Sequence, residues 1–328
     1  MLMPELPALP GGEDASKVKR MEAFRIYYNH TIHPELMRME RQRLRLLRLF
    51  LFSGIILTGI ALAGFYLNIT ALTLFLALPV GVYIFYLLYR IQEFRQAFKP
   101  NITNLILDFI DDGMNFDPNH PLQYEPKRSI EKPIFLKSEI FGTDAPYYEG
   151  EDYISGRIGE MDFEMSELAV KEFSPVRNRL NDVFSGAFLH ATFPEETYGR
   201  VIIWPRRFRQ HLTRAIKNFT WEGGSNVDHE VNNEAFREAF LTYATEETHV
   251  EGILSMPMQD AIVQYRIQTG KEIYMSFINR EIYAAVTEDK DLLEPYLFRS
   301  NLSFELVKEF FEDINLLLRI AEDFDQTH

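Results

Sequence analysis

The sequence predicts an α+β protein in which a two-helix transmembrane hairpin precedes a mixed domain with a mainly antiparallel sheet and flanking helices. Two observations predict the hairpin: 41 consecutive uncharged residues lie between Arg48 and Arg90, and basic residues flank both ends of this run. One observation predicts the domain, because from about residue 150 short stretches of alternating apolar and polar residues are separated by turns. With 46% hydrophobic residues among 328, the chain can bury a sizeable core.

Charge is unevenly distributed along the chain. Residues 1–99 carry 12 Lys or Arg against 7 Asp or Glu, and the rest carries 22 against 41, which together give the formal net charge of -14. We expect no nucleic-acid partner, because binding to phosphates requires a basic surface. The absence of cysteine excludes disulfide scaffolds, cysteine zinc sites, iron–sulfur clusters and thiol nucleophiles.

The first 48 residues divide into a tail and a helix. Residues 1–16 contain three prolines and two glycines and lack the features of a secretory signal, so they are predicted to form a flexible tail. Residues 17–48 are predicted to form a basic cytoplasmic helix with Pro34 in a first-turn position. From Pro34 onward the sequence requires no break before the uncharged run, so the helix is expected to continue into it.

The uncharged run is too long for one membrane span. As a helix its 41 residues would extend roughly 60 Å, about twice the hydrocarbon thickness of a bilayer. A break at Asn68 to Thr70 leaves two spans of 19 residues, 49–67 and 71–89, so that 49–89 forms a transmembrane hairpin.

Basic residues set the expected orientation. Those that flank the hairpin are Arg38, Arg41, Arg43, Arg45, Arg48, Arg90 and Arg95. Under the positive-inside rule, both termini and the soluble domain then lie in the cytoplasm, and the turn lies on the other side of the membrane. The expected partner of this part of the chain is therefore the lipid bilayer.

The rest of the chain is predicted as a connector, 90–150, and a soluble α+β domain, 151–328. The connector includes short helices at 102–111 and 129–141. The domain's expected strands are 153–158, 163–173, 183–193, 200–204, 236–243, 250–254, 272–278 and 281–286. Its expected helices are 208–219, 258–269 and 304–324. Asn279 and Arg280 are expected to form a two-residue hairpin turn.

Acidic residues are concentrated where the soluble domain begins. The candidates for a functional surface are Glu149, Glu151, Asp152 and Glu167. Paired carboxylates can perform acid–base chemistry or hold Mg²⁺ or Ca²⁺. A solvated acidic edge that protects a sheet from pairing with other chains explains the same residues. We therefore treat them as an interaction surface and assign no catalytic, cofactor-binding or metal-ligating residue.

Several short motifs, read in order, resemble a bacterial membrane family recorded as domain of unknown function 3137. They are Tyr28-Asn29, Pro34-Glu35-Leu36, Gly150 to Gly159, Ser166-Glu167-Leu168 and Val183 to Phe188, together with the basic helix that leads into the hairpin. The likeness covers roughly residues 20–325. It implies a multi-pass protein of the bacterial cytoplasmic (inner) membrane and suggests a LemA-type membrane protein as a partner. It implies no reaction.

The sequence favours an interaction or scaffold protein that presents an acidic cytoplasmic domain at the membrane, and a homo-oligomer is compatible with it. No P-loop, dinucleotide-binding, serine-hydrolase or HExxH motif is present, so an enzyme is disfavoured and no cofactor is expected. One alternative is a membrane-tethered sensor of a small ligand or lipid, with a pocket lined by Phe184, Phe188 and Trp204. A second is an unfamiliar metal-dependent enzyme that uses the acidic stretch 149–167.

Overall fold

The computed structural model describes residues 12–112, 122–174, 178–193, 199–207, 210–245, 248, 253–288 and 293–327. The chain divides into two compact units. Unit 1 comprises residues 1–109 and 292–309, and unit 2 comprises residues 110–291 and 310–328. Each unit is described by itself.

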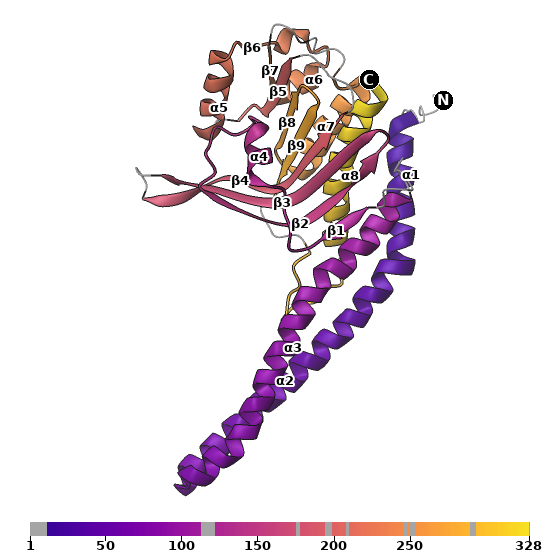
Figure 1. Ribbon diagram of the computed structural model, residues 1–328. Coiled ribbons are helices and arrows are strands. Elements are labelled where there is room, and N and C mark those ends of the chain that lie inside the picture. The colour runs from indigo at the N-terminus through magenta and orange to yellow at the C-terminus, as the bar shows by residue number, and fades with distance from the viewer. Residues whose placement is uncertain are drawn as a thin grey trace, which may run out of the picture. The chain divides into compact units, whose positions relative to one another are not determined.

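Unit 1 is built on two long antiparallel helical arms (Figure 1). The first arm consists of α1 (Gly12–Tyr27), a π-helical turn (Tyr28–Ile32) and α2 (His33–Leu67), and the second arm is α3 (Thr70–Asp111). The expected continuation of the basic helix into the first uncharged segment is confirmed. The helix begins at Gly12, however, so the tail predicted at 1–16 includes helical residues; residues 1–11 lie outside the described part of the chain.

The second arm is longer than predicted. The helix expected at 102–111 is not a separate element, because α3 continues through Pro100 to Asp111 without a break. Proline lacks a backbone N–H and usually interrupts a helix, which made a boundary near residue 100 the natural expectation. The first third of the predicted connector is therefore the end of a 42-residue helix.

The turn between the two arms lies at the predicted residues. Asn68 ends α2 in the left-handed conformation, with φ of 54°, and its N–H donates to the carbonyl of Gly64. Asparagine tolerates this conformation better than most residues that carry a side chain. The N–H of Ile69 also donates to the Gly64 carbonyl, at 3.2 Å, so α3 begins within two residues.

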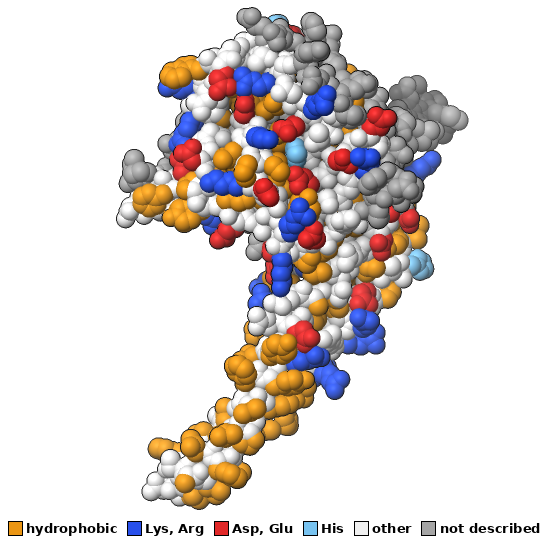
Figure 2. All heavy atoms as spheres, in the orientation of Figure 1, with side chains coloured by type: hydrophobic (Ala, Val, Ile, Leu, Met, Phe, Trp, Pro, Cys, Tyr) orange, Lys and Arg blue, Asp and Glu red, His pale blue; other side chains and the backbone are white. Residues whose placement is uncertain are grey.

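Both arms carry segments that are long and apolar enough to cross a membrane. In the most apolar 18-residue window of each arm, only 11% and 6% of the residues are buried. Figure 2 shows hydrophobic side chains covering the distal half of the two helices, with charged side chains confined to the proximal half on this face. These segments therefore do not form a core of their own.

Unit 2 contains one nine-stranded sheet in the order β1-β2-β3-β4-β9-β8-β5-β7-β6. Every strand pair is antiparallel, as the short predicted connections require. The strands are β1 (Gln123–Glu125), β2 (Tyr147–Ile158), β3 (Met161–Ser174), β4 (Arg179–Thr192), β5 (Arg200–Pro205), β6 (Ser225–Asn226), β7 (Phe240–Ala244), β8 (Ile273–Ile278) and β9 (Glu281–Thr287). The strand-rich stretches before and after residue 206 thus join a single sheet.

Among the described residues, five α-helices accompany the sheet. They are α4 (Lys132–Lys137), α5 (Gln210–Trp221), α6 (Glu234–Ala239), α7 (Met256–Thr269) and α8 (Phe304–Thr327). The helices expected at 208–219, 258–269 and 304–324 correspond to α5, α7 and α8. Of the helix expected at 129–141, only α4 is helical.

One predicted strand is partly wrong. The stretch 236–243 begins as α6, because the side chain of Asn233 caps that helix by accepting a hydrogen bond from the N–H of Phe236, and only β7 is extended. The hairpin turn at Asn279 and Arg280 is confirmed, with Asn279 at φ of 54°. The strand expected at 250–254 falls largely outside the described residues.

A filled aromatic core lies on one face of the sheet. Phe135 from α4 stacks on Phe141 with ring centroids 5.3 Å apart, and Phe184 and Phe188 from β4 pack against Phe135. Leu212, Ala215 and Phe219 from α5 extend the same cluster. Figure 1 shows α7 and α8 on the other side of the sheet. The sheet is thus covered on both faces.

Candidate functional site

The base of the helical hairpin binds a segment from far along the chain. Residues 293–303, here called the return loop, belong to unit 1 and lie beside α2 and α3. The guanidinium of Arg43 donates to the carbonyl of Leu297 at 2.5 Å and to both carboxylate oxygens of Glu40, at 2.9 and 2.6 Å. Both charged residues are buried. This ion pair lies within α2, and the bond from Arg43 to the Leu297 carbonyl joins it to the return loop.

The electrostatics of this link keep Glu40 ionised. Burial by itself would raise the pKa of the Glu40 carboxyl, but the hydrogen bonds and positive charge of Arg43 outweigh burial and lower it. The backbone N–H of Asn301 also donates to Glu40, at 3.5 Å. Removal of either partner would leave an uncompensated buried charge.

The predicted membrane-flanking arginines fall into three groups. Arg43 is buried and paired with Glu40. Arg38 pairs with Glu35 at 3.0 Å, Arg90 with Glu93 at 2.7 Å and Arg95 with Glu294 at 3.8 Å. Arg41, Arg45 and Arg48 are exposed on α2. The flank is therefore basic and partly compensated by nearby carboxylates.

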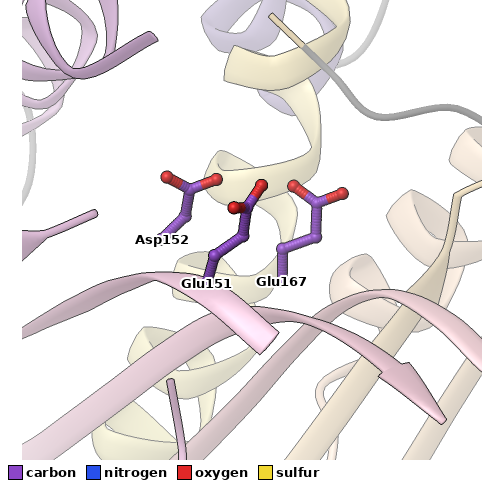
Figure 3. Close-up of side chains that lie close together, drawn as sticks. All are labelled: Glu151, Asp152 and Glu167. Carbon is purple, nitrogen blue, oxygen red and sulfur yellow. The ribbon is translucent and has the colours of Figure 1, made fainter. Parts of the chain in front are cut away.

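The acidic residues predicted at the start of the soluble domain do come together. Glu151, Asp152 and Glu167 each place one carboxylate oxygen within 4.8 Å of the other two. Glu151 on β2 is directly opposite Glu167 on β3, and a bulge after Glu151 adds Asp152 to the same group. Figure 3 shows the three side chains pointing the same way, with Glu151 in the middle. Glu149 is exposed farther along β2 and is not part of this group.

The bulge determines how Asp152 is held. Its φ of 57° is in the left-handed region, and its N–H donates to the carbonyl of Pro126 instead of to β3. The hydroxyl of Tyr124 donates to the Asp152 carboxylate at 2.5 Å. Asp152 is buried, Glu167 is half-buried and Glu151 is exposed. Three hard oxygen donors in this arrangement could accept a divalent cation, but each of these side chains also interacts with the protein.

A second polar group on β3, β4 and β9 was not predicted from the sequence. His190 lies between Glu164 and Glu281, with Nδ1 at 2.9 Å from Glu164 and Nε2 at 3.9 Å from Glu281. The hydroxyl of Tyr153 donates to the other oxygen of Glu164 at 2.8 Å. The His190 ring stacks on Tyr283 with centroids 5.0 Å apart. Strand alternation identified these faces, but only the register of β2, β3, β4 and β9 brings the five side chains together.

Burial and hydrogen bonding shift the pKa of Tyr153 in the same direction and that of Glu164 in opposite directions. Burial raises the pKa of Tyr153 to about 12, and its bond to the Glu164 carboxylate adds to that shift. Burial would also raise the pKa of Glu164, but the bonds that it accepts from His190 and Tyr153 outweigh burial and lower it. Glu164 is therefore held as a carboxylate.

A third group ties α7 and α8 to the sheet. The Lys271 ammonium donates to both carboxylate oxygens of Asp313, at 3.0 and 2.7 Å, and also pairs with Glu288. Tyr265 donates its hydroxyl to Asp313. Burial opposes the charge on Lys271, but the two carboxylates outweigh it and raise the pKa of this lysine. The group is buried, which suits a structural role.

The surface near α5 has a hollow of about 390 Å³, with Phe141 and Phe219 at its apolar part and Glu139, Arg214 and Glu222 at its polar part. It is distinct from the pocket that the sequence suggested. Phe184, Phe188 and Trp204 are at most 2% exposed and fill the core, and the Trp204 indole N–H donates to the carbonyl of Ile140. The pocket predicted for a ligand sensor is therefore a packed core.

Comparison with known proteins links the C-terminal part of the chain to a family. A family described as "Protein of unknown function (DUF3137)" matches residues 182–326. Among solved structures, the mycobacterial trehalose monomycolate transport factor A is similar over 61% of this chain and 88% of that chain, with 10% identity and a TM-score of 0.30. No curated protein matches the chain.

Proposed function

Because residues 182–326 form a domain of the DUF3137 family, whose description states no function, we propose a role from the geometry of the chain. The helical hairpin anchors the protein in the bacterial cytoplasmic membrane, and unit 2 is presented in the cytoplasm to bind another protein. The acidic charge of the chain beyond residue 99 suits a domain that stays soluble beside an anionic membrane.

The observation that carries this proposal is the exposed apolar surface of the two arms. Phe52, Phe65, Phe75 and Phe85 have exposed fractions of 67%, 90%, 76% and 76%. A soluble protein rarely leaves so large a contiguous apolar surface uncovered. A bilayer supplies the missing apolar environment, and a helix of 19 residues is about as long as its hydrocarbon layer is thick.

A protein-binding role is supported by the β3–β4 extension, the part of these two strands that projects beyond the rest of the sheet (Figure 1). Phe173 on β3 and Leu180 on β4 are paired across the β3–β4 extension, and each is 44% exposed. Charged residues surround them, with Lys171 near Asp182 at 3.7 Å. An apolar centre with a polar rim is the usual anatomy of a protein interface.

The acidic group of Glu151, Asp152 and Glu167, with Glu149 nearby, is the second part of the proposed contact surface. Its negative charge selects a basic partner surface and speeds encounter with it. The resemblance found in the sequence suggests a LemA-type membrane protein as the partner, and a second copy of the chain is the other candidate.

Site-specific photocrosslinking in intact cells tests the proposal. A photoreactive amino acid at Phe173, and in a second variant at Glu151, should give a crosslinked band of constant size, because both positions face the partner. The same probe at Ile267, a 70% exposed residue on α7, is the matched control and should give none.

Leu180→Asp should then lower the yield of the Phe173 crosslink several-fold, because it places a charge at the centre of the apolar contact. If neither Phe173 nor Glu151 gives a reproducible band while the protein is present at its normal level, the interaction role is wrong. A band whose mass equals two copies of the chain would identify self-association as the interaction.

A further inference from the structure

We propose that the return loop inserts into the headgroup layer of the bilayer that the hairpin crosses, as a second membrane contact far along the chain from the spans. This inference rests on the proposed membrane anchoring. Residues 296–300 form the apex of the return loop, and Phe298 at the apex is 74% exposed, with Arg299 next to it also exposed.

The apex is held rigidly. The side chain of Asn301 accepts a hydrogen bond from the N–H of Tyr296 at 2.7 Å and donates to the carbonyl of Tyr296 at 3.0 Å. Asn301 itself is buried, and so are Pro295 and Leu293. The buried residues on both sides and the hydrogen bonds of Asn301 therefore hold the apex as a turn, and the conformation of this turn exposes Phe298.

The contacts of the loop set its depth. Arg43, which binds the carbonyl of Leu297, is six residues before Leu49, and Arg95, which pairs with Glu294, is six residues after Tyr89. Along a helix, six residues correspond to about 9 Å. The headgroup layer extends roughly 5–8 Å beyond the hydrocarbon on each side. Both anchor points therefore lie next to the headgroup layer.

The chemistry of the apex fits that layer. Tyrosine is enriched at the interface between lipid and water, phenylalanine of interfacial segments buries at the boundary between headgroups and acyl chains, and arginine there is attracted to anionic headgroups. Phe298, Tyr296 and Arg299 combine both properties in adjacent positions. Arg45 and Arg48 are also exposed on α2, nearer the spans. The apex thus carries side chains that suit a place among lipid headgroups.

A fluorescent probe at Phe298 tests the inference, and the absence of native cysteine makes single-cysteine labelling clean. The full-length Phe298→Cys variant, labelled with nitrobenzoxadiazole, is placed in nanodiscs of phosphatidylcholine with a minority of phosphatidylglycerol. Its emission should shift to the blue, and quenching by aqueous iodide should be several-fold weaker than for the control.

The matched control is Ile26→Cys, because Ile26 is also an exposed hydrophobic residue of unit 1, at 61%. It lies 23 residues before Leu49 on the same continuous helix, or roughly 35 Å away. Its label should stay open to iodide. A lipid with a spin label high on its acyl chain should quench the label at 298 and not the label at 26.

A third variant, Phe52→Cys, separates the two proposals. If the label at 52 is protected and the label at 298 is open to iodide, the hairpin crosses the membrane and the loop proposal is wrong. If both are open, the membrane anchoring itself is wrong. If the label at 298 is protected only when two copies share a disc, a second copy covers the loop, which also overturns the proposal.

Discussion

At the scale of single residues, the polar group around His190 shows how unit 2 uses charge inside its sheet. Glu164 is four-fifths buried yet accepts hydrogen bonds from both His190 and Tyr153. These bonds stabilise the carboxylate more than burial destabilises it, so the pKa of Glu164 is lowered. In the unfolded chain the pKa of this carboxyl is about 4.5. Because the pKa is lower in the folded protein, ionised Glu164 stabilises the fold at pH values above 4.5. This stabilisation is lost as the pH falls through the pKa of the folded state.

We therefore predict that Glu164→Gln removes part of the acid sensitivity of the protein. At neutral pH the variant should be less stable by about 1–3 kcal/mol, because hydrogen bonds to a charged group are lost. As the pH falls below the unfolded pKa of about 4.5, the difference from the natural protein should shrink. Thermal unfolding of the full-length protein in detergent, followed by circular dichroism, measures both.

Glu238→Gln on the exposed surface of α6 is the control and should change little at any pH. A Glu164→Gln variant whose deficit stays constant from neutral to acid pH would show that the Glu164 carboxylate does not contribute in the way described.

Residue-level chemistry could be predicted only in part. The sequence singled out Glu151, Asp152 and Glu167 because acidic residues are dense there, and the structure brings these three together. His190 stood alone in its strand, so nothing local marked it. Its partners Glu164 and Tyr283 lie on two other strands, and only the register of β3, β4 and β9 makes them neighbours.

At the scale of elements, the two helical arms pack most closely next to the turn. A Cβ atom on Gly64 would lie 1.8 Å from the hydroxyl oxygen of Thr73 on the opposite arm, whereas a Cβ atom on Gly59 would meet no atom within 4 Å. The two glycines are five residues apart in the same segment. The same substitution at both positions therefore adds the same side chain, but only at Gly64 does that side chain meet the opposite arm.

We predict that Gly64→Leu separates the arms at the turn and destabilises the protein by about 1–3 kcal/mol, as overpacking does. Gly59→Leu should leave stability nearly unchanged. Thermal unfolding in one detergent, with both variants measured side by side, checks the difference. Equal stability of the two variants would mean that the arms do not pack at Gly64.

Elements with a long hydrophobic repeat were predicted from the sequence, whereas a short helix that depends on its N-terminal cap was not. The alternation in β3 and β4 and the helical spacing in α8 repeat over many residues, so one misplaced side chain does not obscure them. The six residues of α6 are too few for such a signal, and the cap from Asn233 decides their conformation. The continuation of α3 through Pro100 overrode a local preference for a break.

At the scale of the whole molecule, the proposed function requires the turn at Asn68 and the body of unit 2 to lie on opposite sides of the membrane. Basic residues flank both ends of the uncharged run, which favours both ends on the cytoplasmic side. Since the chain has no cysteine, the side of any position can be read from one introduced thiol.

We predict that Ile69→Cys, at the turn, reacts with a membrane-impermeant maleimide added to cells with a permeabilised outer membrane. Trp221→Cys, at an 80% exposed position on α5, should react only after the inner membrane is opened. Labelling of both residues in closed cells, or of residue 221 alone, would contradict the proposed topology.

The sequence by itself determined the two long apolar helices, the turn at Asn68 and the antiparallel α+β character of the rest, because these depend on length, charge and periodicity along the chain. Only the tertiary structure decided that the strands form one sheet, that Arg43 is buried against Glu40, and that the return loop contacts α2. These features join residues up to 254 positions apart. Local patterns carry no information about such contacts, which packing and charge pairing select.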